Sequence, residues 1–123
     1  MKINWFSNKQ KEGNASFYAS HLTLNATAKQ PFERVEFARI GVDEQNRLIL
    51  SPLDKDAYES PLLDKSECYP ISTHASYARI SSTLLLKQIA DSFGLTFSST
   101  PYHAKAIYDE REKVLIVDMK GGK

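Results

Sequence analysis

Apolar residues recur along this chain at the spacing of a helix in one stretch and at the spacing of strands in several others. The helical stretch is Thr83–Phe93, where apolar residues return every three or four positions and so form one buried stripe. The stripe consists of Leu85, Leu86, Ile89, Ala90 and Phe93. Ser81 or Ser82 can cap the first turn, and Gly94 can adopt the left-handed conformation that ends a helix. The pattern predicts one main helix near 82–93.

Alternation of apolar and polar residues predicts strands elsewhere. The predicted strands are Ser16–Asn25, Val35–Asp43, Arg47–Leu50, Ile71–Ser81, Tyr102–Asp109 and Lys113–Met119. Pro52 is expected to end the ladder of the strand before it, because proline has no backbone N–H. Asn25 can cap a short helix through Ala28–Glu33, which Pro31 keeps brief.

Two segments of the chain resemble each other, Val42–Leu50 and Tyr108–Ile116. In both, Asp-Glu opens a turn, a basic residue closes it, and an aliphatic run follows. Each half of the chain then has the order strand, helix, hairpin, and one such unit is too small to bury its own apolar face. The sequence therefore predicts a β-rich α+β domain over 16–119, made of two strand–helix–hairpin units that cover each other within one chain or between two chains.

The same pattern divides the chain into segments. The half-units are 16–53 and 71–119, and an acidic connector, 54–70, joins them. Residues 1–15 are expected to form a flexible arm and residues 120–123 a frayed tail. The acidic residues of the connector lack the register of a calcium loop, so we expect no metal there.

Composition narrows the function classes only slightly. The 123 residues carry a net charge of +1, whereas a dedicated nucleic-acid binder usually has a basic excess. The single cysteine, Cys68, excludes an intramolecular disulfide and fits a reducing compartment. No apolar run has the length of a membrane helix, and Met1–Lys9 lacks the core of a signal peptide. We therefore expect a cytoplasmic protein without a membrane partner.

The second half-unit resembles the swapped-hairpin family of AbrB-type regulators and MazE-type antitoxins. The resemblance rests on Arg79-Ile80-Ser81, on the stripe with Leu85 and Ile89, on Gly94-Leu95, and on the two strands that follow. Ser81 stands where the family has proline. Two such units in one chain would be similar to MraZ-type proteins. The resemblance implies a homodimeric, two-fold barrel that contacts duplex DNA through arginines on its strands.

Three residues are the candidates for contact with nucleic acid. Arg79 matches the family's arginine, and the internal repeat adds Arg39 and Lys105 on the paired strands. An arginine can fork onto guanine edges or phosphates, and a lysine can neutralise a phosphate. Each can instead be a solvated strand charge or an ion-pair partner of Glu36, Asp109 or Glu110.

Other functions compete with DNA binding by a swapped-hairpin barrel. A helix-turn-helix would place its recognition helix across Ser98–Lys105, where Pro101 falls in the interior. An enzyme would need Cys68 or a serine beside a histidine, and nothing in the sequence sets the distance from Cys68 to His74. We therefore predict no catalytic residue and no cofactor.

The remaining alternative is a protein–protein interaction module, such as an antitoxin or a mobile-element accessory protein, that binds no nucleic acid. The near-neutral charge and the six tyrosines favour it, since tyrosine supplies contact area at a low entropy cost.

Overall fold

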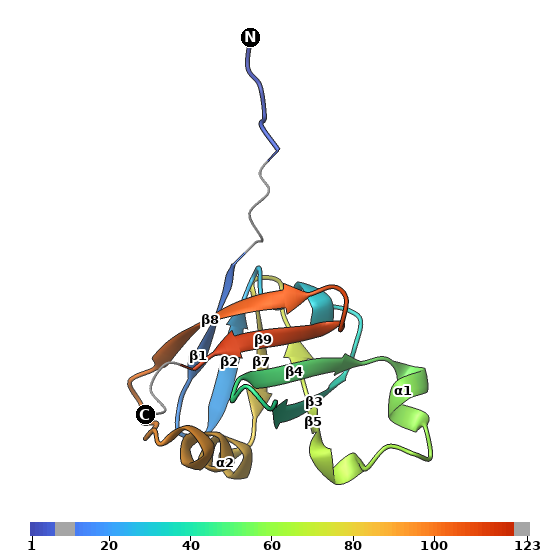
Figure 1. The fold of residues 1–123 in the computed structure, drawn as a ribbon, viewed down its shortest axis with the longest axis vertical. Coiled ribbons are helices and arrows are strands. Elements are labelled where there is room, and N and C mark those ends of the chain that lie inside the picture. The colour runs from blue at the N-terminus through green and yellow to red at the C-terminus, as the bar shows by residue number, and fades with distance from the viewer. Residues whose placement is uncertain (7–11, 120–123) are drawn as a thin grey trace.

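In the computed structural model, which describes residues 1–6 and 12–119, one antiparallel sheet of nine strands curls into a nearly closed barrel (Figure 1). The strands are β1 (Gly13–Phe17), β2 (His21–Asn25), β3 (Phe37–Val42), β4 (Leu48–Leu53), β5 (Cys68–Pro70), β6 (Ser72–Thr73), β7 (Tyr77–Ser81), β8 (Tyr102–Asp109) and β9 (Val114–Asp118). The helices are α1 (Lys55–Glu59), α2 (Thr83–Phe93) and the 3-10 turns η1 (Gln30–Phe32) and η2 (Lys65–Glu67). The predicted β-rich α+β class with one main helix is confirmed.

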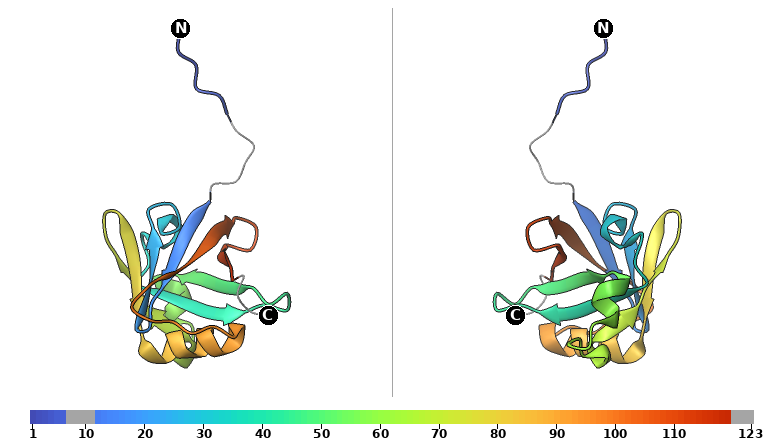
Figure 2. Two further views of the ribbon diagram at one scale, coloured as in Figure 1. Left: turned by 90° about the vertical axis from the view of Figure 1, so that its left-hand side faces the viewer. Right: turned by 90° about the vertical axis from the view of Figure 1, so that its right-hand side faces the viewer.

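The main helix, α2, closes one end of the barrel (Figures 1 and 2). Its predicted stripe is buried and joins a core built from the inward side chains of the strands, such as Phe17, Leu50 and Val117. The Ser82 side chain accepts a hydrogen bond from the Leu85 amide at 3.1 Å, and Gly94 ends the helix with φ of 65°. Pattern and caps agree, and the predicted helix is confirmed.

The strand order, β5-β3-β4-β9-β8-β1-β2-β7-β6, has an approximate two-fold arrangement. β4 and β9, the second strands of the hairpins β3–β4 and β8–β9, pair with each other, and so do β2 and β7. β1 lies between β2 of its own half and β8 of the other half. The segment that contains β5, Ile71 and β6 repeats this, since it pairs first with β3 and then with β7.

The turns that resemble each other in sequence also share their chemistry. Asp43 Oδ1 accepts hydrogen bonds from the amides of Gln45 and Arg47 at 3.1 and 2.8 Å. Asp109 Oδ1 does the same for Arg111 and Glu112 at 2.9 and 3.2 Å. An aspartate at the start of a turn can satisfy amides that the ladder leaves unpaired. The pKa of Asp43 is lowered chiefly by its bond from the Arg47 amide.

The prediction of a single strand over Ser16–Asn25 is wrong, because the chain reverses in its middle. The Tyr18 amide donates to the His21 carbonyl at 2.9 Å, and Phe17 pairs with Leu22. The turn shifts the parity of the inward residues, so one alternating pattern does not span it. The first strand also begins earlier, at Gly13, so 13–15 of the predicted arm belong to the barrel.

Two further strand predictions differ from the structure. Ile71–Ser81 is a hairpin of β6 and β7, in which the His74 amide donates to the Tyr77 carbonyl at 2.7 Å. Pro52 does not end its strand, since β4 continues to Leu53 and Pro52 pairs with Ala38. By strand alternation, the Pro52 nitrogen faces the β9 side, where pairing stops at Leu50. The missing N–H therefore costs no ladder bond.

The predicted short helix after Asn25 is the single turn η1, with Pro31 at its start and Phe32 buried. Asn25 Oδ1 accepts from the Ala28 amide at 3.0 Å in the turn before η1, but Asn25 does not cap η1, which begins after Lys29 without a side-chain cap bond. The predicted connector, 54–70, holds α1, η2 and β5. Of the predicted arm, 7–11 lie outside the described residues, as does the predicted tail, 120–123. Within the described part of the chain, no helix is long and apolar enough to span a membrane.

Candidate nucleic-acid interface

The three candidate side chains all point outward from the barrel. Arg39, Arg79 and Lys105 are exposed, and each alternates with buried neighbours on its strand. The outward direction follows from strand geometry, in which successive side chains project to opposite faces. Exposure is what a nucleic-acid contact requires, but the surroundings of the three side chains differ.

Arg79 and Lys105 lie on the same stretch of outer sheet, formed by β7, β2, β1 and β8. Arg79 pairs with Thr23 of β2, and Lys105 pairs with Asn14 of β1. In register, the two basic residues are three strands and two residues apart, which is roughly 16 Å at ordinary strand spacings. We call the outward side of β7, β2, β1 and the first half of β8 the basic face.

The basic face has an unusual charge distribution for a protein with nearly balanced charge. The strands β1, β2, β6 and β7 contain no aspartate or glutamate. All three histidines of the chain lie on this face or at its edge: His21 on β2, His103 on β8 and His74 in the turn between β6 and β7. Asp118 of β9, opposite Lys105 in register, marks the border of the face. Arg79 and Lys105 are therefore the fixed charges of a face whose strands β1, β2 and β7 carry no carboxylate.

Polar and aromatic contacts hold the side chains of the basic face. Ser16 Oγ and His103 Nδ1 lie 2.9 Å apart, and Ser20 Oγ and His21 Nδ1 lie 3.1 Å apart. The His21 ring stacks on Tyr18, with 4.4 Å between centroids. At the other edge, the His74 ring stacks on Tyr77 at 4.5 Å. These contacts order the surface before any ligand arrives.

Arg79 keeps most of its binding capacity. Its Nε donates to Ser81 Oγ at 2.9 Å, which orients the guanidinium and leaves both terminal nitrogens for a ligand. Among the described residues, the ion pairs are Lys29–Glu33, Arg47–Asp43 and Arg39–Glu67. Neither Arg79 nor Lys105 is in one of them. Both charges are therefore free to meet a phosphate without first breaking an ion pair.

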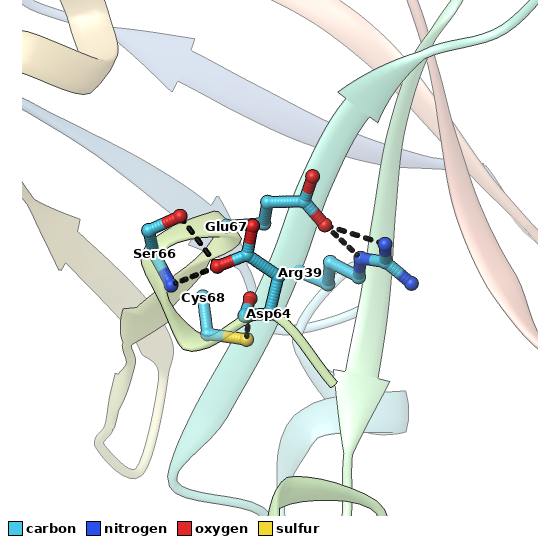
Figure 3. A network of polar contacts seen from close by, with 5 residues as sticks. All are labelled: Arg39, Asp64, Ser66, Glu67 and Cys68. Carbon is cyan, nitrogen blue, oxygen red and sulfur yellow. Dashed lines mark hydrogen bonds and ion pairs between the residues drawn. The ribbon is translucent and has the colours of Figure 1, made fainter. Parts of the chain in front are cut away.

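Arg39 has a different environment, on the outer side of β3 (Figure 3). Its Nε donates to Glu67 Oε1 at 3.0 Å, and its Nη2 donates to the same oxygen. Glu67 belongs to η2, whose start is capped by Asp64 Oδ1 accepting from the Ser66 amide and hydroxyl at 3.0 and 2.6 Å. The Ser66 hydroxyl bond is the main cause that lowers the pKa of Asp64. The Arg39 charge is thus already matched, within a network that fastens η2 to β3.

Cys68 stands beside this network, and its thiol donates to the Asp64 carbonyl at 3.7 Å. Desolvation raises the pKa of the Cys68 thiol, although the Arg39 charge works in the other direction. An activated cysteine nucleophile needs a lowered pKa, so this environment is the reverse of a catalytic one. Among the described residues, no three His, Cys, Asp or Glu side chains come together as metal ligands.

His21 provides a test of the electrostatics of the basic face. Burial lowers its pKa below 6.5, and the Arg79 charge lowers it further. We expect Arg79→Gln to raise the pKa of His21 while leaving it below 6.5, because burial remains. An NMR titration of the His21 ring signals measures the shift. Lys105→Gln is the control and should leave the His21 titration unchanged; an equal shift in both variants would contradict the role given to Arg79.

The same lowered pKa makes stability depend on pH. The folded protein favours neutral His21, whereas the unfolded chain titrates near the ordinary value of about 6.5. The contribution of His21 to stability is therefore fully present above that value, and it is lost as the pH falls through the folded pKa.

Comparisons with protein-family models, with curated proteins and with solved structures each find no match to this chain.

Proposed function

We propose that this domain is a DNA-binding regulator that contacts duplex DNA through the basic face and works as a dimer. The observation that carries the proposal is that four neighbouring strands, β6, β7, β2 and β1, lack carboxylates, while Arg79 of β7 and Lys105 of β8 are in none of the ion pairs among the described residues. Phosphate contacts supply most of the affinity of such proteins, and a local cationic surface is enough to make them.

The sequence resemblance to swapped-hairpin regulators and antitoxins supports the same proposal. Arg79, the residue that matches the family's arginine, is also the one whose terminal nitrogens remain available. The two-fold strand order, in which each half pairs with the other, is compatible with a barrel of that type. Arg39, bound to Glu67, has a smaller part in this proposal than Arg79 and Lys105.

Binding of random duplex DNA, followed by fluorescence polarisation at low and physiological salt, tests the proposal. We expect affinity to fall steeply as salt rises, because each neutralised phosphate releases counterions. The double variant Arg79→Gln/Lys105→Gln should reduce the slope of log affinity against log salt by about 2, one for each lost phosphate contact.

The matched control is Lys55→Gln/Lys87→Gln, which removes the same charge from exposed positions on α1 and α2. The control should bind nearly as the parent protein does, since long-range charge effects are screened beyond about 10 Å. Equal losses of DNA affinity in the two double variants would show that the basic face is not the interface. Absence of binding at low salt would sink DNA binding altogether.

The alternative, a protein–protein interaction module, is favoured by a different observation. Apolar side chains with large exposed fractions include Leu62 at 94%, in the segment after α1, and Leu84 at 66%, on α2, and neither belongs to the strands of the basic face. A module of that kind would retain partner binding in the Arg79→Gln/Lys105→Gln variant and lose it when Leu84 is replaced by serine. A pull-down with the two variants separates the functions.

A further inference from the structure

The strand β3 has one edge that is only half covered. β4 pairs with it along its whole length, from Phe37 to Val42. On the other side, β5 pairs with Phe37–Arg39 and then gives way to η2. The Ile71 amide donates to the Glu36 carbonyl at 2.9 Å, so by alternation the backbone groups of Ile40 and Val42 face this same side. No described strand pairs with them there, and such an edge is a template for another strand.

A groove of about 630 Å³ lies along this uncovered edge. Apolar parts of its lining come from Ile40, Val42, Ile49 and Tyr69, and Gln88 of α2 forms part of its border. Val42 is 45% exposed although its side chain shares the inward parity of the buried Ala38. The uncovered edge therefore offers backbone hydrogen-bonding groups together with an apolar surface for side chains, the combination that receives an added strand.

The N-terminal segment Met1–Phe6 has the complementary features. Met1, Ile3 and Trp5 alternate with Lys2 and Asn4, which is the pattern of a strand with one apolar face, and the alternation ends at Phe6. The apolar members are nevertheless exposed, Ile3 at 51% and Trp5 at 82%. The segment projects away from the barrel, at the end opposite α2, whereas the groove borders α2 (Figures 1 and 2). The segment and the groove of the same chain therefore lie toward opposite ends of the molecule.

We propose that Met1–Phe6 of one copy adds as a strand to the edge of β3 at Ile40–Val42 in a second copy, with Ile3 and Trp5 in the groove. Exchange of the two segments gives a symmetric dimer in which the same contact occurs twice. This contact buries the exposed apolar side chains of the segment and pairs the free backbone groups of the β3 edge. This contact does not involve the basic face, so the dimer forms whether or not the domain binds DNA.

Light scattering over a concentration series measures the dimer directly. The segment variant Ile3→Ser/Trp5→Ser should raise the dimer dissociation constant by about tenfold or more, as expected for the loss of a buried aromatic anchor. The control Lys2→Ser/Asn4→Ser changes the other parity and should leave the dimer intact. The groove variant Gly41→Glu should also weaken the dimer, and it is compatible with the fold because a Cβ at Gly41 meets nothing within 4 Å.

Mixing the segment variant with the groove variant identifies the contact. One carries an intact groove and the other an intact segment, so together they should form a heterodimer that neither variant forms with itself. Trp5 is the only tryptophan, and its emission should shift to the blue as the parent protein dimerises. A monomer at every concentration would overturn the proposal. So would a dimer that survives the segment variant, or a blue-shifted Trp5 in a monomer, which would mean that the segment binds its own chain.

Discussion

Replacing Phe17 by alanine is expected to lower the free energy of unfolding by about 3–5 kcal/mol. Phe17 is fully buried and lies on β1, where its ring stacks on Phe97 at 5.4 Å and meets Tyr102 at 6.3 Å. The substitution leaves a cavity that the surrounding strands cannot close. Domains of this size are stable by about 5–15 kcal/mol in total. Urea denaturation followed by circular dichroism measures the loss.

Phe37→Ala is the matched control, because it deletes the same ring from a half-buried, outward position. Phe37 stacks on Tyr58 of α1, with 3.8 Å between ring centroids. Solvent can enter the space left there, so we expect a loss of about 1–2 kcal/mol. Equal losses for the two variants would contradict the inward direction assigned to Phe17 and with it the position of β1.

Gly13→Ala is expected to destabilise the domain by about 1–3 kcal/mol, although it adds a single methyl group. A Cβ at Gly13 would lie 2.7 Å from both the backbone nitrogen and the Cβ of Ala28. The backbone of Ala28 cannot move easily, since its amide is bonded to Asn25 Oδ1 at 3.0 Å. The start of β1 would have to shift away from the turn before η1. Thermal unfolding at a fixed protein concentration measures the effect.

The comparison for Gly13 is Gly41→Ala on β3, where the added Cβ meets nothing within 4 Å. This substitution should be neutral or slightly stabilising, because alanine restricts the unfolded chain more than glycine does. If Gly41→Ala and Gly13→Ala unfolded alike, steric contact with Ala28 would not be the cause.

Local signals in the sequence predicted the main helix and the two hairpins β3–β4 and β8–β9. Thr83–Phe93 combines one apolar stripe with a serine cap and a glycine stop, and all three signals agree. The aspartates that open the turns at Asp43 and Asp109 fix both hairpins through bonds within a few residues. Features of this kind depend on neighbours in the chain, so the sequence displays them.

Features that depend on distant neighbours were missed. Nothing near Gly13 in sequence shows that it lies against Ala28, and nothing near Pro52 shows that its nitrogen faces a gap in the ladder. For the candidate site, outward direction could be predicted from strand parity. The common surface of Arg79 and Lys105, and the pairing of Arg39 with Glu67, depend on strand order and on η2. The lack of carboxylates in β1, β2, β6 and β7 was visible, but it gains meaning only once these strands are neighbours.

The position of β1 between β2 and β8 has a consequence for how the chain folds. Gly13 pairs with Ala106, so β1 has pairing partners on both edges only after β8, the strand before the last, has been made. Contacts between residues so far apart in sequence form slowly, because closing the long loop between them costs entropy before the contacts can stabilise the structure. During synthesis, β1 and β2 could pair only with each other until β7 and β8 are made, and an isolated hairpin is marginally stable. Closure of the barrel is therefore a late event that a truncation before β8 would prevent.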